Sequence, residues 1–365
     1  MRVLVLTNNM NGLLSFRKEV MQSMIDKGYK VYISVPYDVN YEEQINEMDI
    51  QILDTKVDRR GINPIKDLGL ILRYRKIVKD IMPDVVLSYT IKPNLYGGLA
   101  CMWANVPQLV NVTGLGTAVE NNGVLQKFII WLYRICLKNV RVMFFQNSAN
   151  MEFCQEHGML HGRPELLPGS GVNLSRFAKF EMPEGEVIKF ICIGRAMKQK
   201  GTGDYLDMVE IIKKEYPKTE FHVLGACDDG EYEERIKKMH NNGTVVYDGV
   251  TTDVRPFLKN VHCTVHASYY PEGMSNVLLE SCASGRAIIT TTRPGCGEIV
   301  EDGVNGYITK AHDVNDLCIQ VRKFLALSPA ERSAMGEAAR TKVERKFNRQ
   351  IVIDKYLKEI ESLNT

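Results

Sequence analysis

The sequence predicts an α/β protein built from two doubly wound domains. Short apolar, β-branched runs alternate along the whole chain with longer amphipathic stretches, which is the pattern of parallel strands covered by helices on both faces. The 365 residues exceed what a single hydrophobic core usually supports. A cluster of turn-forming residues at 167–173 (LPGSGVN) separates two periodic halves. We therefore place the domains at residues 1–170 and 171–348, with a last helix at 349–365 that is expected to cross back to the first domain.

About six strands are expected in each domain. Each is a run of four to six mostly apolar residues bounded by turn or helix signals. The front-half strands are expected at Val3–Thr7, Val31–Val35, Gln51–Thr55, Val85–Tyr89, Leu109–Val112 and Val142–Gln146. Those of the back half are expected at Lys189–Gly194, Glu220–Leu224, Val245–Tyr247, Thr264–Ala267 and Ala287–Thr291.

Composition excludes several classes of protein. A net charge of +2 gives no indication of a nucleic-acid partner. The nine cysteines stand singly, without a C-x-x-C pair, and the seven histidines are scattered, so we expect reduced thiols in the cytoplasm and no zinc site. No tract is apolar enough to span a bilayer, and the first residues suggest a buried strand rather than a signal peptide.

The segment from Ser268 to Glu280 carries the sharpest motif. Ser275 is a suitable N-cap for a helix, and the loop before it follows a strand, so backbone N–H groups at the helix start are expected to bind a diphosphate. Glu272 lies in the loop within reach of a bound sugar. Glu280 lies in an apolar part of the helix, where a ribose diol would supply the hydrogen-bond donors that a carboxylate needs. The backbone predicted to hold the diphosphate belongs to Gly273, Met274, Ser275 and Asn276.

Each glutamate also has a plainer interpretation. Glu272 alone would be a surface loop residue, and Glu280 alone would belong to an internal ion pair. The two together, after a strand and around a helix start, favour a binding site.

A second candidate site directly follows the first strand of the back half. Gly194 and Arg195 end that strand, and Lys200 precedes Gly201, so the turn offers cations that could neutralise a leaving diphosphate. The order Lys-Gly does not match a P-loop, which disfavours ATP hydrolysis. The alternative is a solvated basic turn.

Two front-half turns are weaker candidates. Gly12 lies in the loop after the first strand, where a glycine allows close approach of a ligand. The turn from Thr113 to Gly116 has Val119 at the third glycine position of a dinucleotide fingerprint, so a dehydrogenase is disfavoured.

The predicted helix at residues 125–141 combines apolar residues, a tryptophan and a purely basic fringe. Such a helix could lie on an anionic membrane surface, and the basic stretch from Lys56 to Lys79, which includes Arg59 and Arg60, could add to it. The alternative is a crossover helix packed between sheet and solvent.

These motifs resemble glycosyltransferase family 4, the retaining enzymes of the two-domain GT-B fold, in which two Rossmann-like domains face each other across a cleft. The resemblance covers essentially the whole chain, and its most specific part is the glutamate-x7-glutamate spacing of Glu272 and Glu280. The stretch from Lys92 to Gly97, followed by the turn at Thr113, resembles a narrower group that extends polyprenyl-diphosphate-linked oligosaccharides for capsule, O-antigen or protein glycosylation, some of them as N-acetylgalactosaminyltransferases.

The resemblance implies a hexose or N-acetylhexosamine donor carried on UDP and a lipid-linked saccharide acceptor. Glu280 would hold the ribose, Glu272 the transferred sugar, and Arg195 and Lys200 the departing diphosphate, assisted by the Gly273–Asn276 backbone, Gly194 and Gly12. The acceptor side would involve Lys92, Asn94 and Thr113. The chain has no Asp-x-Asp, so we expect no metal or other cofactor.

The expected location is the cytoplasm, including the inner face of the cytoplasmic membrane.

Two rival functions stay open at this point. A nucleotide-sugar 2-epimerase shares the fold but acts without an acceptor, and a non-catalytic sugar-binding protein would bind without turnover.

Overall fold

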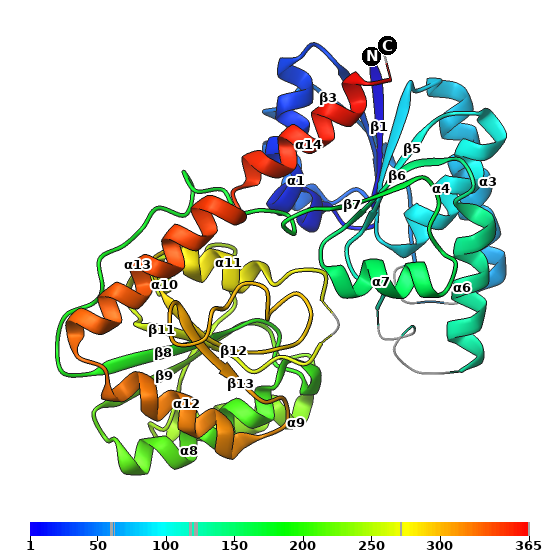
Figure 1. Cartoon of the computed structure of the whole chain (residues 1–365). Helices are drawn as coiled ribbons and strands as arrows, with labels where there is room; N and C mark the ends of the chain where they lie inside the picture. Colours follow the sequence, from blue (N-terminus) through cyan, green and yellow to red (C-terminus); the bar gives the residue numbers. More distant parts are fainter. Residues whose placement is uncertain (59–60, 62, 117–118, 120–122, 271, 364–365) are drawn as a thin grey trace. The chain divides into compact units, whose positions relative to one another are not determined.

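The computed structural model describes residues 1–58, 61, 63–116, 119, 123–270 and 272–363 (Figure 1). It divides into two compact units. Unit 1 contains Met1–Ser170 and Gln350–Thr365, and unit 2 contains Gly171–Arg349. Arg59, Arg60 and Pro271 lie outside the described residues.

Unit 1 contains a seven-stranded sheet in the order β3-β2-β1-β4-β5-β6-β7, and all its strand pairs are parallel. Its central strands are mostly apolar and are buried on both faces, as parallel strands are. All six strands expected from the sequence are present. The strands are β1 (Arg2–Leu6), β2 (Lys30–Val35), β3 (Ile50–Asp54), β4 (Val85–Tyr89), β5 (Gln108–Val112), β6 (Val140–Phe145) and β7 (Arg163–Leu166).

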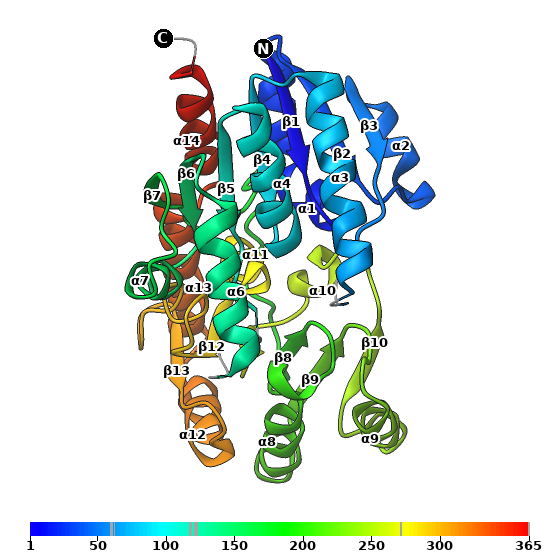
Figure 2. The same ribbon diagram turned by 90° about the vertical axis from the view of Figure 1, so that its right-hand side faces the viewer.

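Two helical layers cover this sheet. One layer contains α3 (Pro64–Ile81), α4 (Ile91–Ala104) and α6 (Val124–Cys136), which lie side by side in Figure 2. The other contains α1 (Met10–Asp26) and α14 (Arg349–Glu361), whose apolar residues share a core with β1, β2 and β4. Tyr356 of α14 is fully buried against Phe144. The shorter helices of this unit are η1 (Val39–Tyr41), α2 (Glu42–Asn46) and α7 (Ser148–Glu156).

Unit 2 contains a six-stranded parallel sheet in the order β10-β9-β8-β11-β12-β13. All five strands expected here are present, so the prediction of two parallel α/β domains is confirmed. One apolar core gathers α8, α9 and α12 on one face, and a second gathers α10, α11 and most of α13 on the other. The strands are β8 (Ile188–Ile193), β9 (Thr219–Leu224), β10 (Val246–Gly249), β11 (Cys263–His266), β12 (Ala287–Thr291) and β13 (Gly306–Thr309). The helices are η2 (Lys198–Lys200), α8 (Thr202–Glu215), α9 (Gly230–Asn241), α10 (Arg255–Lys259), α11 (Asn276–Ala283), α12 (Val314–Ala326) and α13 (Pro329–Lys346).

Both sheets change direction of winding at their centre. β1 lies between β2 and β4, and β8 lies between β9 and β11. In open α/β sheets, ligands bind outside the carboxyl ends of the strands at such a switch point. The loops after β8 and β11 are therefore the expected location of a site in unit 2.

The structure corrects two local expectations. The helix predicted at residues 125–141 ends at Cys136, and Arg141 lies in β6, because the β-branched residues Val140 and Val142 continue the sheet. The helix after β1 begins at Met10, so Gly12 lies in its first turn and not in a loop. No helix among the described residues is long and apolar enough to cross a membrane.

Candidate functional site

The loops after β8 and β11 are joined by hydrogen bonds. The Tyr269 amide donates to the Gln199 carbonyl at 3.0 Å, and the Ser268 hydroxyl donates to the same carbonyl at 3.4 Å. Gly201 allows this approach. Its φ is +69°, and a Cβ there would lie 2.2 Å from the Ala267 carbonyl oxygen, so no other residue fits without moving the backbone.

A cluster of charged and polar side chains forms where these loops meet. The Lys200 ammonium pairs with Oε1 of Glu272, and both side chains are less than one-fifth exposed (18% and 13%). Nε2 of His266 lies 3.6 Å from the same oxygen and 3.4 Å from Oγ of Ser275. The Lys200 ammonium also lies 5.1 Å from the centre of the Tyr270 ring. The structure thus brings together residues from both predicted motifs.

Glu272 is held in its ionised form. Burial by itself raises the pKa of this carboxyl, but the hydrogen bond from His266 and the charge of Lys200 outweigh burial and lower the pKa to about 2. Burial lowers the pKa of His266, so its imidazole is neutral near pH 7. The cluster therefore presents an ionised carboxylate, Glu272, paired with the ammonium group of Lys200.

Glu280 lies in a different electrostatic environment. Burial raises the pKa of this carboxyl to about 7, although Arg349 and Arg176 act in the opposite direction. Strongly shifted carboxyl pKa values occur often at functional sites, which makes Glu280 a candidate binding residue.

The start of α11 is fixed against a neighbouring loop. The Ser275 amide donates to the Gly295 carbonyl at 2.8 Å, and a Cβ at Gly295 would approach the Gly273 carbonyl oxygen to 2.8 Å. Ser275 is the N-cap residue, as expected, but its hydroxyl makes no capping bond and contacts His266. Met274 is buried, and Asn276 is the first helical residue.

Arg195 and Gly194 lie at the end of β8. The Arg195 guanidinium pairs with Asp228 at 2.6 Å, and its side chain is 41% exposed. Gly194 has a φ of +137°, and a Cβ on the neighbouring Gly225 would lie 2.0 Å from the Gly194 carbonyl oxygen. This close contact between two glycines lets β8 and β9 end side by side.

The other predicted residues belong to unit 1. Gly12 lies on α1, and Thr113 is half-buried just after β5. The Lys92 ammonium pairs with Asp67 at 2.6 Å. Asn94 is 1% exposed, and its amide nitrogen donates to the Asn111 carbonyl at 2.8 Å, so it ties α4 to β5.

Sequence reasoning missed three members of the unit 2 site. His266 is the last residue of β11, and a polar residue at the carboxyl end of a buried strand was a usable signal. Arg176 and Arg349, which act on Glu280, lie 104 residues before and 69 residues after it in the numbering, so no local pattern could reveal them.

Comparisons with known proteins identify the family of the chain. The model "Glycosyl transferase 4-like" matches residues 2–147, and the model "Glycosyl transferases group 1" matches residues 176–342. A Campylobacter jejuni protein, N,N'-diacetylbacillosaminyl-diphospho-undecaprenol alpha-1,3-N-acetylgalactosaminyltransferase, is 24% identical and aligns over 98% of each chain.

Solved structures show the same fold. A glycosyltransferase from Rickettsia africae superposes with a TM-score of 0.83 at 17% identity, covering 100% of this chain and 98% of the other. The Anabaena protein HepE, solved in complex with UDP-glucose, superposes with a TM-score of 0.78 at 14% identity and 99% coverage of both chains.

Proposed function

Since the chain belongs to glycosyltransferase family 4, we propose that it transfers a hexose or N-acetylhexosamine from UDP to a polyprenyl-diphosphate-linked saccharide, with retention at the anomeric carbon. Its place in glycan or polysaccharide biosynthesis is shared with its relatives. The observation that carries this proposal is the buried pair of Lys200 and Glu272 at the switch point of unit 2. Glu280 lies eight residues after Glu272, in helix α11.

Each member of the pair has a role in transfer. The Glu272 carboxylate accepts hydrogen bonds from hydroxyls of the transferred sugar, while the Lys200 ammonium stabilises the negative charge that develops on the departing diphosphate. Arg195 adds a second cation that can leave Asp228 when the diphosphate binds. At the start of α11, the Ser275 amide is not a donor for the diphosphate, because it donates to the Gly295 carbonyl; the proposed backbone donors are those of Met274 and Asn276, beside Gly273. Gly194 leaves room for the phosphates.

The proposed reaction requires no protein base. In front-face attack, the leaving diphosphate oxygen accepts the proton of the attacking hydroxyl as the glycosidic bond to UDP breaks and the new one forms on the same face. His266 is neutral and contacts Glu272, so it positions that carboxylate. We propose that the chain acts without a metal, since two cationic side chains are available to the diphosphate.

The acceptor is assigned to unit 1. The relative from Campylobacter jejuni acts on an undecaprenyl-diphosphate-linked substrate by its name, which supports a lipid-linked acceptor. Lys92 and Thr113 lie at or beyond the carboxyl ends of β4 and β5, where a ligand of this unit would bind. Asn94 completes the proposed acceptor set.

A lipid-linked acceptor places the enzyme at the cytoplasmic face of a membrane. On α6, Val124, Leu125, Phe128 and Trp131 are 86%, 40%, 47% and 53% exposed, and the exposed cations Lys127 and Lys138 flank them. We propose that this stripe binds an anionic bilayer.

Vesicle binding tests the membrane proposal. The Trp131→Glu variant should lose most co-sedimentation with phosphatidylglycerol vesicles, because it puts a charge into the apolar stripe. Ile319→Glu, at a similarly exposed position on α12 of unit 2, is the matched control and should bind as the wild type does. Equal binding by both variants would refute the proposal.

The pH dependence of donor binding tests the proposed function. UDP-N-acetylglucosamine is a suitable ligand, because its esterified phosphates keep a constant charge between pH 6 and pH 8. The ionised form of Glu280 accepts hydrogen bonds from both ribose hydroxyls, and its pKa of about 7 means that this form is lost as pH falls. The dissociation constant should therefore be about tenfold larger at pH 6 than at pH 8.

The control is Glu280→Gln, which keeps the shape of the side chain but cannot titrate. It should bind more weakly than the wild type at pH 8, with a pH-independent affinity. A wild-type affinity that does not change with pH, or an unchanged pH dependence in the variant, would remove Glu280 from the ribose site.

A further inference from the structure

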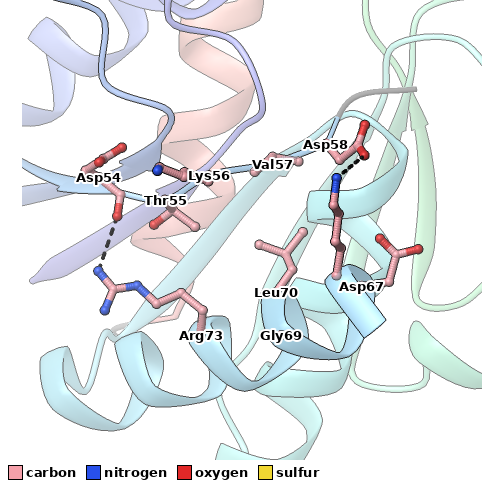
Figure 3. A pocket seen from close by; sticks show the side chains of 10 residues that line it. Asp54, Thr55, Lys56, Val57, Asp58, Asp67, Gly69, Leu70 and Arg73 are labelled. Carbon is pink, nitrogen blue, oxygen red and sulfur yellow. Dashed lines mark hydrogen bonds and ion pairs between the residues drawn. The ribbon is translucent and has the colours of Figure 1, made fainter. Parts of the chain in front are cut away.

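A cavity of about 580 Å³ lies between β3 and α3 of unit 1 (Figure 3). Its volume is within the range of roughly 300–1,000 Å³ that small-molecule sites have. Figure 3 shows the chain from Asp54 to Asp58 along one wall and helix α3 along the other. The lining residues are Asp54, Thr55, Lys56, Val57, Asp58, Lys66, Asp67, Gly69, Leu70 and Arg73.

The cavity lies at the ligand-binding edge of its sheet. Asp54 is the last residue of β3, so the cavity opens outside the carboxyl ends of the parallel strands. Asp67 in its wall pairs with Lys92, which lies on the first turn of α4 just after β4. The cavity therefore adjoins a residue that we assign to the acceptor.

Its lining combines hydrogen-bonding groups of both kinds with apolar surface. Three carboxylates and three cations surround Val57 and Leu70. Among the described residues, the Arg73 guanidinium donates only to the Asp54 carbonyl, at 3.2 Å, and Lys56 forms no ion pair. Donors thus remain available for a ligand.

This combination of charged and apolar lining residues favours one class of ligand, a saccharide. Equal numbers of positive and negative side chains disfavour a free polyanion, and the carboxylates disfavour an acyl chain. A saccharide fits both features, because its hydroxyls donate and accept hydrogen bonds while its ring faces pack on apolar side chains.

Gly69 lines the cavity from the side of helix α3. A glycine inside a helix is less stable than alanine by about 1 kcal/mol. An added Cβ at Gly69 would meet no atom within 4 Å, so packing does not exclude a side chain there. Gly69 is exposed and lines the cavity, so a bulky side chain at this position is expected to reduce the space in it.

We propose that this cavity binds the saccharide portion of the acceptor. The inference rests on the proposed function, which supplies a saccharide acceptor, and it goes further by assigning that saccharide to the β3–α3 cavity.

The test fills the cavity without disturbing the fold. The Gly69→Phe variant of the full chain, fluorescently labelled, is applied to an array of immobilised glycans in the presence of UDP. Glycans that the wild type captures should be bound at least about tenfold more weakly by Gly69→Phe, because the ring occupies the site. Leu72→Phe is the matched control: it adds a ring one turn further along α3 at an exposed position outside the cavity, and should bind as the wild type does.

Two further measurements distinguish a misfolded variant from a wrong cavity assignment and from a wrong proposed function. Gly69→Ala should raise the melting temperature, which would show that the position accepts a side chain. The affinity for UDP should be unchanged in Gly69→Phe, because the donor residues belong to unit 2. Glycan capture by Gly69→Phe equal to that of the wild type, or no capture by the wild type, would overturn the inference. Absence of UDP binding in the wild type would instead refute the proposed function.

Discussion

Glu272→Gln should lower kcat for sugar transfer by at least about a hundredfold, as the loss of one preorganised transition-state contact does. The wild-type carboxylate is ionised because His266 and Lys200 outweigh its burial, and glutamine has the same shape without the charge. The variant would still fit the cluster but could no longer act as a double acceptor for sugar hydroxyls. UDP release from the UDP-sugar that the wild type turns over fastest measures the effect.

A loss of folding must be separated from a loss of catalysis. Removing one member of a buried pair leaves the other uncompensated, which typically destabilises by about 3–5 kcal/mol. The double variant Glu272→Gln/Lys200→Met removes both charges, so it should recover stability but not activity. Glu210→Gln, on the surface of α8, is the matched control and should keep wild-type kcat. Wild-type turnover by Glu272→Gln would contradict the assignment.

Lys200→Met is the second variant with a large expected effect. It keeps most of the side-chain length but removes the charge that would stabilise the departing diphosphate, so kcat should fall by about a hundredfold or more. The interaction strengthens as negative charge develops, and kcat should therefore fall more than the affinity for the UDP-sugar.

Lys198→Met provides a control in the same turn. Lys198 is exposed and lies two residues before Lys200 in η2, so its removal changes the charge of the loop equally. It should retain kcat within about threefold, which is the scatter expected of surface charges. Equal losses in both variants would indicate a general electrostatic effect and not a specific contact.

The sequence predicted most of the sheets because buried parallel strands are continuous apolar runs. It missed two of the four edge strands, β7 and β13. β7 reads Arg-Pro-Glu-Leu, which is polar and contains a proline tolerated only at an edge, and β13 reads Gly-Tyr-Ile-Thr, a short run that begins with a glycine. The end of α6 was misplaced because the apolar pattern continues from the helix into β6 without a strong breaker.

The candidate site was predicted only in part. Glu272, Glu280 and the helix start at Ser275 are local in sequence, so their spacing could indicate a site. The partners of these residues are not local: Lys200 lies 72 residues from Glu272, and their pairing depends on the adjacency of β8 and β11. The cavity beside Gly69 was not predicted, since nothing in a helical pattern distinguishes a glycine that faces open space. Lys56 and Arg73, expected to extend a membrane-binding surface, line that cavity.

Calorimetric titration with UDP, GDP and ADP shows whether unit 2 binds a UDP-sugar through Glu280 and the Lys200–Glu272 pair. We expect micromolar binding of UDP, weaker binding of GDP and ADP, the same UDP affinity with and without magnesium, and loss of binding in Glu280→Ala. No binding of any of the three nucleotides, or full UDP binding by Glu280→Ala, would contradict it.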